Sequence, residues 1–313
     1  MRPLPIRVRS DENIRAGCYG VHLFNRKNGL NVLFDEARVS EEFWATAPRQ
    51  ISIALTNSCD LSCAFCYAPK SQASLKSSIV IGWLRELDAN GCFGVGFGGG
   101  EPTLYRDFPL LCRYASTSTK LAVTFTTHAH RINDELAAKL KGNVHFIRIS
   151  MDGVGQTYEE IRGRPFAALK SRLKTIRTLA PFGINYVVNA RTLRDLDTAV
   201  ELSAQMGARE FLLLPEQPVR DAKGIDPGTA QALRNWVWQY RGPIPLTISE
   251  ASSDGMPACS PIPCETGLQA YAHIDATGIL KASSYAHGGV LIGQGGVMRA
   301  LGLLKSQHQE VDE

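Results

Sequence analysis

Three cysteines stand close together at CxxxCxxC spacing, namely Cys59, Cys63 and Cys66, and Phe65 directly precedes the last of them. An apolar run at residues 51–55 leads into this stretch and predicts a buried strand followed by a loop. Three thiolates that converge from one short loop suit a four-iron cluster in which one iron has no protein ligand. The alternative is a zinc knuckle or the burial of three unrelated thiols, but a structural zinc site needs four closed ligands, and no fourth Cys or His lies nearby.

From position 50 onward, short apolar runs alternate with helical patterns. Strands are predicted at 50–57, 93–97, 120–126, 144–150, 184–189 and 210–214, and helices near 77–90, 107–116, 132–141, 165–180, 194–206 and 227–240. This alternation indicates right-handed crossovers and a parallel sheet, so the fold class is α/β. In barrels of such units the reactive groups collect where the strands end, which is where the cysteine loop stands.

Both ends of the chain carry a predicted hairpin. Asn28-Gly29 lies between apolar runs at 19–24 and 30–34, and Asn-Gly in this setting is a strong signal for a β-hairpin. Cys18 at the entry of this hairpin is expected to be a buried thiol. The expected division is an N-terminal β-hairpin preface at 1–49, a barrel at 50–248 and a C-terminal extension at 249–313, in which a linker at 249–263 precedes a hairpin of runs 268–274 and 279–283.

Composition narrows the class of protein. The 313 residues suffice for a large core, and the net charge of +4 is too mild to indicate a nucleic-acid partner. No apolar run is long enough to span a bilayer, and the N-terminus lacks the apolar core of a secretion signal, so we expect a cytoplasmic protein without a membrane partner. Eight cysteines in such a chain, three of them clustered, favour metal or redox chemistry over disulfides.

Two further motifs follow the cysteines in the chain. The run FGGGEP occupies residues 97–102 after an apolar strand, and SMDG at 150–153 is followed by IRG at 161–163. Together with CxxxCxFC, they resemble the radical S-adenosylmethionine (SAM) superfamily and its SPASM/twitch peptide-modifying branch. The resemblance implies a partial (β/α)6 TIM-type barrel with a small SPASM/twitch-like extension at its C-terminal end.

The resemblance also implies cofactors and the residues that bind them. A [4Fe–4S] cluster would be held by Cys59, Cys63 and Cys66, and SAM would chelate its open iron. An electron from an external donor such as flavodoxin or ferredoxin would then cleave SAM to a 5′-deoxyadenosyl radical that abstracts hydrogen from the substrate. The SAM contacts would be Gly98, Gly99, Gly100 and Glu101 at the methionyl ammonium, Ser150 and Arg162 at the carboxylate, Thr127 and Asn189 at the ribose, and Tyr67 and Leu214 at the adenine.

Extensions of this branch normally hold auxiliary iron–sulfur clusters, but here the cysteine pattern is degraded. Only Cys259 and Cys264 remain locally, and Ser283 stands where a further cysteine is expected. A cluster usually needs four protein ligands. The pair could complete an auxiliary cluster with Cys18 or a non-cysteine ligand, or the extension could be a structural flap over the barrel mouth.

The leading hypothesis for function is an enzyme that modifies a ribosomally made peptide by cross-linking, epimerisation or another C–H reaction. A small-molecule enzyme, such as a sugar or alcohol dehydrogenase, is the rival, and the preface, which looks too short for a peptide-recognition module, fits it. A non-catalytic metal-binding scaffold is a third hypothesis. It would have no need of Glu101 and Arg162 in register with the cysteines.

Overall fold

A ten-stranded, mostly parallel sheet forms the centre of the computed structural model, which describes residues 9–219, 222–249, 253–259 and 262–309. The strand order is β12-β9-β8-β7-β6-β5-β4-β13-β14-β15. Its parallel barrel strands are β4 (Gln50–Thr56), β5 (Gly94–Gly99), β6 (Ala122–Thr127), β7 (Phe146–Ser150), β8 (Phe182–Val188), β9 (Phe211–Pro215) and β12 (Leu246–Ile248). The six predicted strands and the α/β class are therefore confirmed, and β12 extends the series by one strand.

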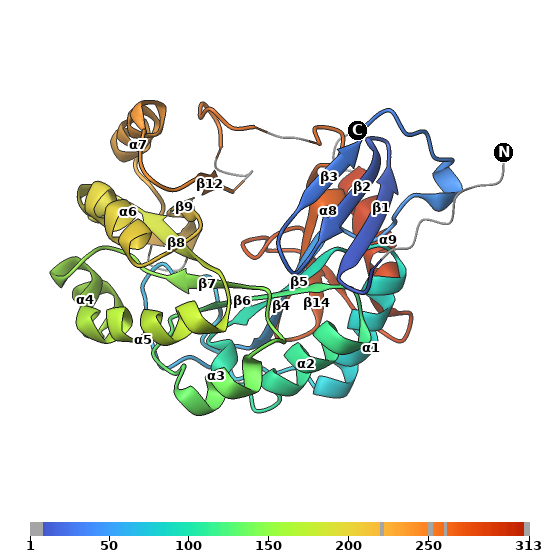
Figure 1. Ribbon diagram of the computed structural model, residues 1–313, viewed down its shortest axis with the longest axis horizontal. Coiled ribbons are helices and arrows are strands. Elements are labelled where there is room, and N and C mark those ends of the chain that lie inside the picture. The colour runs from blue at the N-terminus through green and yellow to red at the C-terminus, as the bar shows by residue number, and fades with distance from the viewer. Residues whose placement is uncertain (1–8, 220–221, 250–252, 260–261, 310–313) are drawn as a thin grey trace.

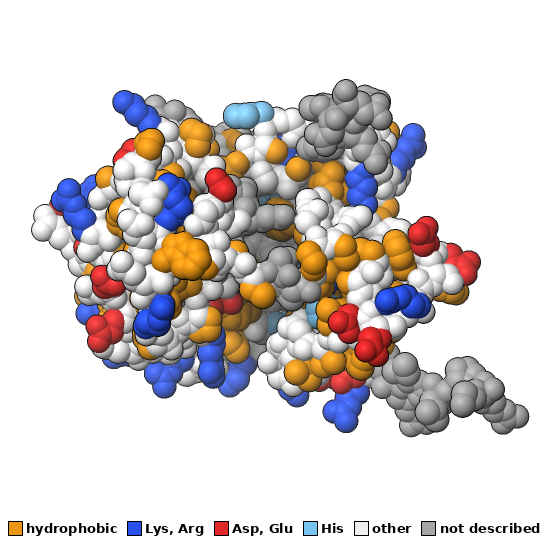
Figure 2. All heavy atoms as spheres, turned by 90° about the horizontal axis from the view of Figure 1, so that it is seen from above, with side chains coloured by type: hydrophobic (Ala, Val, Ile, Leu, Met, Phe, Trp, Pro, Cys, Tyr) orange, Lys and Arg blue, Asp and Glu red, His pale blue; other side chains and the backbone are white. Residues whose placement is uncertain are grey.

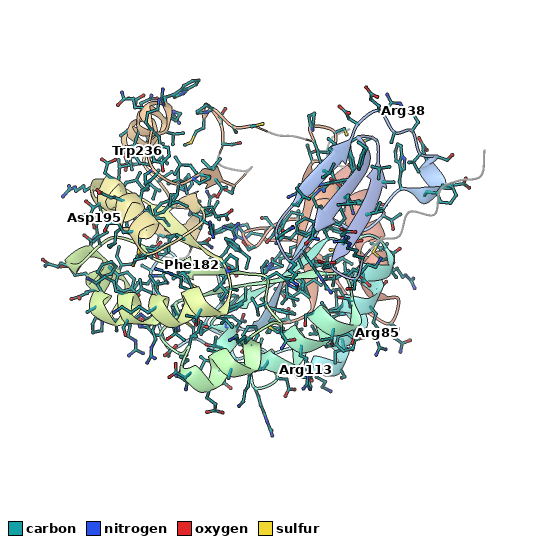
Figure 3. The ribbon with its side chains drawn as sticks, viewed as in Figure 1. Arg38, Arg85, Arg113, Phe182, Asp195 and Trp236 are labelled. Atoms are coloured by element: carbon teal, nitrogen blue, oxygen red, sulfur yellow. The ribbon has the colours of Figure 1, made fainter. Side chains whose placement is uncertain are left out.

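Helices cover the outer face of this sheet (Figure 1). They are α1 (Ser77–Ala89), α2 (Phe108–Ser118), α3 (Asp134–Leu140), α4 (Gln156–Arg162), α5 (Phe166–Leu179), α6 (Leu196–Gln205) and α7 (Pro227–Gln239), with short 3-10 turns η1 (Glu41–Phe43), η2 (Pro102–Leu104) and η3 (Thr192–Asp195). Alternate strand residues such as Ile51 and Ile53 are fully buried in the core between sheet and helices. Phe182 lies in this core, whereas Arg85 and Arg113 project outward from α1 and α2 (Figure 3).

The barrel is not closed. The sheet and its helices follow an arc, and the open side of the arc lies between α7 and a separate N-terminal sheet (Figure 1). Seen from above, the surface is hollowed between these two sides (Figure 2). A two-stranded ribbon of β10 (Pro218–Val219) and β11 (Ala222–Lys223) follows β9.

The N-terminal sheet has three antiparallel strands, β1 (Glu12–Gly17), β2 (Gly20–Asn25) and β3 (Asn31–Phe34). The predicted hairpin is the β2–β3 pair, and β1 adds a strand that the apolar pattern did not indicate. Arg26 docks this sheet by donating from Nη1 to the carbonyl oxygens of Thr119 (2.8 Å) and Leu121 (2.9 Å). The N-terminal sheet therefore packs against the end of the barrel where the parallel strands begin, opposite to the end that carries the cysteine loop.

The C-terminal hairpin forms as expected from β13 (Tyr271–Ile274) and β14 (Ile279–Lys281), and β15 (Val290–Leu291) pairs with β14. Helix α8 (Gly267–Ala270) precedes it and α9 (Gly296–Gln309) follows it. It does not lie over the barrel mouth as a separate flap, because β13 pairs in parallel with β4 and continues the main sheet. Pairing with the exposed edge of β4 satisfies backbone groups that the edge would otherwise leave open.

One buried carboxylate joins the two ends of the chain. Glu265, just before α8, accepts from Arg15 Nε of β1 (2.7 Å) and from Arg49 Nε before β4 (2.6 Å), and it also forms ion pairs with Nη2 of both arginines. The side chains of Glu265 and Arg15 are each 3% exposed. Arg15 also donates to the carbonyl oxygens of Ala47 and Gly91, so one cluster of charges links three segments.

None of the helices in the described ranges is both long and apolar enough to cross a membrane.

Removal of the Glu265 charge should destabilise the protein strongly. In Glu265→Gln, two guanidinium groups lose their carboxylate in a buried place, and we expect the free energy of unfolding to fall by about 3–5 kcal/mol. Glu135→Gln is the matched control, because its pair with Lys139 is exposed at 74% and 57% and should contribute little to stability. Urea denaturation of both variants measures the difference, and equal losses would contradict the structural role of Glu265.

Candidate functional site

The cysteine loop follows β4 and contains no regular helix or strand. Cys63 is buried, whereas Cys59 and Cys66 are half-buried, and Cys66 N donates to Cys63 O at 3.2 Å to close a tight turn. All three thiols therefore come from one short segment at the C-terminal end of a parallel strand. Because the loop lacks its own ladder of hydrogen bonds, other segments must hold it in shape.

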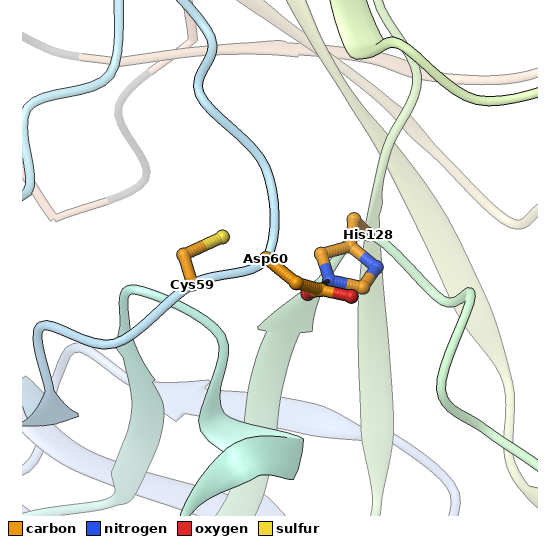
Figure 4. A group of neighbouring side chains, drawn as sticks. All are labelled: Cys59, Asp60 and His128. Atoms are coloured by element: carbon orange, nitrogen blue, oxygen red, sulfur yellow. Dashed lines mark hydrogen bonds and ion pairs between the residues drawn. The ribbon is translucent and has the colours of Figure 1, made fainter.

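Asp60 anchors this loop to two other segments. Its Oδ1 lies 2.8 Å from His128 Nε2, directly after β6, and its Oδ2 lies 3.2 Å from both Arg131 Nε and Arg164 Nη2 (Figure 4 shows Asp60 with His128). Burial opposes the charge of Asp60, but the His128 hydrogen bond and nearby cations outweigh it and hold the pKa of the carboxyl below its ordinary value. The residue next to Cys59 is thus a fixed anion that ties the loop to the sheet.

Cys59, Asp60 and His128 could in principle hold a metal ion, since their ligand atoms lie within 4.8 Å of one another. The hydrogen bonds argue against this use. His128 Nδ1 accepts a hydrogen bond from His130 N (3.2 Å). The ring proton therefore lies on Nε2, which donates a hydrogen bond to Asp60. A protonated ring nitrogen is not a ligand, and we assign the pair to positioning of the loop.

The glycine run after β5 permits a close approach between backbones. Gly99 has φ +116°, and a Cβ there would lie 2.3 Å from Thr56 O. A Cβ on Gly100 would lie 2.2 Å from Ser58 O, whereas at Gly98 it would meet only Tyr67 Oη, at 3.7 Å. Gly100 N and Glu101 N in turn donate to Thr56 O (2.7 Å) and Ser58 O (2.8 Å). The glycines therefore attach the start of the cysteine loop to β5.

Glu101 is nearly fully buried, at 1% exposure, and its oxygens already have protein partners. Oε1 accepts from the hydroxyls of Thr103 (2.6 Å) and Thr127 (2.7 Å), and Oε2 accepts from His128 N (3.0 Å). Glu101 thus joins the ends of β5 and β6. Its contact with a methionyl ammonium stays a prediction, as does the contact of Thr127 with a ribose.

Arg162 brings a positive charge to the thiols. Its Nη1 lies 3.4 Å from Cys63 Sγ, its guanidinium stacks over Phe65 at 5.8 Å, and its Nη2 pairs with Asp152, which is fully buried after β7. Asp152 Oδ1 also accepts from Val187 N (2.6 Å). Arg162 Nε is buried and has no hydrogen-bond partner among the described residues. A buried N–H donor without an acceptor is costly, so this atom suits a ligand group that accepts a hydrogen bond.

These thiols fit an iron–sulfur cluster. Burial raises the pKa of the Cys63 thiol, with Arg162 acting in the opposite direction, and burial likewise raises the pKa of Cys59. Both shifts favour the neutral form of Cys59 and Cys63, and bound iron would be needed to make thiolates of these two thiols. The three soft donors, the cation beside Cys63 and the unpartnered Arg162 Nε together match a cluster with a bound ligand that carries a carboxylate.

The remaining predicted residues lie at the same edge of the sheet. Tyr67 has its hydroxyl against Gly98, and burial raises its pKa, so the phenol stays protonated. Ser150 ends β7, where it pairs with Asn185 of β8; it is half-buried, and its hydroxyl makes no hydrogen bond to another described residue. Asn189 follows β8, but its amide donates to Glu216 Oε2 (2.7 Å) and its carbonyl accepts from Thr192 N (3.0 Å). Leu214 in β9 is half-buried. No described contact joins Ser150, Asn189 or Leu214 to the cysteine loop.

The C-terminal hairpin supplies aromatic groups that the sequence did not connect with the site. Tyr285, in the segment after β14, packs against Tyr67 with ring centroids 5.7 Å apart and the rings tilted by 60°, and it keeps 37% of its surface exposed. His273 of β13 contacts the other side of Tyr67 at 5.9 Å and accepts or donates at Ser52 Oγ (2.6 Å). Burial raises the pKa of Tyr285 to about 12, so its phenol remains a donor. The sequence predicted a hairpin in this part of the chain, but it did not indicate where the hairpin lies relative to Tyr67.

The cysteines of the extension lie away from this loop. Cys264 is exposed and its carbonyl oxygen lies 3.6 Å from Cys18 Sγ in the two-residue turn between β1 and β2. A hydrogen bond with the Cys264 side chain raises the pKa of the Cys18 thiol, and burial acts in the same direction. The expectation that Cys18 is buried is wrong, because a hairpin turn projects it out of the core. No described contact joins Cys259 to either thiol.

Replacement of one glycine should separate loop packing from fold stability. In Gly100→Ala, the new methyl group meets two backbone carbonyls, and we expect a loss of about 1–3 kcal/mol in the free energy of unfolding. Gly98→Ala is the control, because its methyl group meets only Tyr67 Oη, at an ordinary van der Waals distance of 3.7 Å. Equilibrium denaturation of the two variants measures this, and a Gly98→Ala loss as large as that of Gly100→Ala would refute the packing argument.

The sequence of the chain is similar to those of known proteins. The sequence profile described as the radical SAM superfamily matches residues 53–203. The chain is 27% identical over 208 residues to the AdoMet-dependent heme synthase of Methanosarcina barkeri (strain Fusaro / DSM 804). The aligned residues cover 62% of this chain and 59% of that protein. It is 30% identical over 199 residues to the Sporulation killing factor maturation protein SkfB of Bacillus subtilis (strain 168), covering 61% and 48%. The chain thus spans about half the length of these relatives.

The fold of the chain is also similar to that of a solved structure. Streptococcus suis SuiB, solved with S-adenosylmethionine and also with the precursor peptide SuiA, superposes with a TM-score of 0.69 at 15% identity, over 88% of this chain and 82% of that one. At this identity the likeness concerns the fold alone. The profile match covers the strands that carry the cysteine loop, the glycine run and the Asp152–Arg162 pair. Residues 53–203 of the chain therefore match a radical SAM domain.

Proposed function

We propose that this protein is a radical SAM enzyme whose cluster is held by Cys59, Cys63 and Cys66. The match of residues 53–203 to the radical SAM superfamily supports a [4Fe–4S] cluster and SAM as cofactors. The observation that carries the assignment to these residues is the position of Arg162, with Nη1 3.4 Å from Cys63 Sγ and a buried Nε that has no partner among the described residues. When bound, the cluster supplies the electron that cleaves SAM into methionine and the 5′-deoxyadenosyl radical.

The residues around the loop then have distinct tasks. Asp60, held by His128, fixes the loop, and Asp152 orients Arg162 so that its remaining N–H donor can bind the SAM carboxylate, with the Ser150 hydroxyl beside it. Gly98, where a Cβ would contact only the Tyr67 hydroxyl at 3.7 Å, would leave room for the methionyl group near Glu101. Tyr67 and Leu214 would line the adenine, and Thr127 and Asn189 the ribose.

The substrate in this proposal is a peptide. SkfB is by name a maturation protein, and SuiB has been solved with a precursor peptide, which supports the transfer of this substrate class. The barrel is open along one side, and an extended chain could enter there without threading. The reaction would begin with abstraction of hydrogen from a carbon of the peptide, for cross-linking, epimerisation or another C–H modification.

A small-molecule substrate is the second candidate. The similarity to the AdoMet-dependent heme synthase favours it. Incubation of the reduced, cluster-loaded protein with candidate precursor peptides would separate the two. Formation of 5′-deoxyadenosine that rises with a peptide and leaves that peptide changed in mass supports the first, and stimulation only by a small molecule supports the second.

An auxiliary cluster is not part of the proposal. Such a cluster usually has four protein ligands, whereas Cys264 contacts one other described thiol, Cys18. Among the described residues, no three Cys, His, Asp or Glu ligand atoms gather near Cys259 or Cys264.

The first electron would come from an external one-electron donor such as flavodoxin or ferredoxin.

The three loop cysteines should be required for SAM cleavage. After anaerobic reconstitution, the wild type should hold about four irons per chain, and the triple variant Cys59→Ala, Cys63→Ala, Cys66→Ala should hold almost none. Dithionite-driven formation of 5′-deoxyadenosine should fall to background in the triple variant and persist in Cys259→Ala, whose thiol is exposed and outside the loop. Deoxyadenosine from the triple variant would refute the cluster assignment.

Arg162→Ala should weaken SAM binding and leave the cluster in place. Loss of a charge-assisted hydrogen bond is worth about 1.5–3 kcal/mol, so the dissociation constant should rise roughly tenfold or more, as measured by SAM titration. The substitution also leaves Asp152 buried without its cation. The double variant Arg162→Ala, Asp152→Asn removes that charge, and SAM affinity restored in the double variant would show that Arg162 does not bind SAM.

A further inference from the structure

Cys18 and Cys264 form a pair of exposed thiols on two segments that are 246 residues apart in the chain. Cys18 Sγ lies 3.6 Å from Cys264 O, and the Cys264 side chain is a hydrogen-bond partner of the Cys18 thiol. Neither thiol belongs to the cysteine loop. The Cys18 sulfur thus touches the residue that carries the second thiol, and the two side chains are hydrogen-bond partners.

The backbones that carry these two thiols are held in place. Arg15, three residues before Cys18, donates to Glu265, the residue that follows Cys264, and both side chains are buried. Tyr19, next to Cys18, is buried with its ring beneath Arg49, which pairs with the same Glu265. A bond between the thiols would join segments that already touch, so it requires no rearrangement of the fold.

We propose that Cys18 and Cys264 form a reversible disulfide by exchange with a small disulfide such as oxidised glutathione. The thiolate of one cysteine attacks the glutathione disulfide, which forms a mixed disulfide and releases one reduced glutathione. The second thiolate attacks the protein sulfur of that mixed disulfide and releases the other glutathione. Two protein thiols are thereby oxidised and one disulfide is reduced to two thiols. The product bond links the N-terminal sheet to the C-terminal extension.

The experiment uses the cluster-loaded full chain under anaerobic conditions. It is equilibrated with mixtures of reduced and oxidised glutathione, alkylated, digested without reductant and mapped by mass spectrometry. We expect a peptide cross-linked through Cys18 and Cys264 that increases with the oxidised fraction and disappears on addition of dithiothreitol. Cys259→Ser is the matched control, an exposed cysteine of the same extension, and should leave this cross-link unchanged.

The single variants test the pairing. Cys18→Ser and Cys264→Ser should each lose the cross-linked peptide and retain a glutathione adduct on the remaining thiol. Separate adducts on Cys18 and Cys264 in the wild type, or a cross-link from either of them to Cys259, would overturn the proposal, as would iron lost from either single variant. Iron content and deoxyadenosine formation, measured on the same samples, report on the loop cysteines, so failure of the disulfide and failure of the proposed function are distinguishable.

Discussion

The hydrogen bond between Asp60 and His128 is the constraint on which the cysteine loop depends. The loop has no regular secondary structure, yet three sulfur atoms on it must stay near one another. The Asp60 carboxylate lies inside the motif and is bound to buried His128, directly after β6. This contact restricts the conformations that the loop can adopt. The cost in conformational entropy is met on folding, before any cofactor is bound, which is the general advantage of a preorganised site.

The protein uses buried charge pairs where segments distant in sequence must meet. Asp152 holds Arg162 against Cys63, and Glu265 holds Arg15 and Arg49 at the junction of the two chain ends. Burial of a charge is expensive, so such pairs contribute little net stability compared with an apolar contact of the same size. They do exclude other arrangements, because any displacement leaves a charge unpaired. Here one pair orients a group at the site and the other sets the position of the extension.

Local patterns in the sequence were sufficient for the barrel and for the centre of the site. The alternation of apolar runs and helical periods predicted the six strands β4 to β9, because each strand has to bury one face against a helix. The cysteine spacing, the glycine run and the Ser150-to-Arg162 motif are short and contiguous. Since parallel strands end at one edge, their order along the chain sufficed to predict that the segments of Cys63, Gly100 and Arg162 lie at the same edge of the sheet, although not which atoms touch.

Only the tertiary structure decided how the two ends of the chain attach. The hairpin at β13 and β14 was visible in the sequence, but its pairing with β4 was not, since the choice of a sheet edge depends on which edge the rest of the fold leaves open. The contacts of Glu265 with Arg15 and of Cys264 with Cys18 join residues about 250 positions apart. The sequence by itself determined the residue types for a cluster and the strands that carry them; which charge or thiol each distant residue meets is a property of packing, because no local period encodes it.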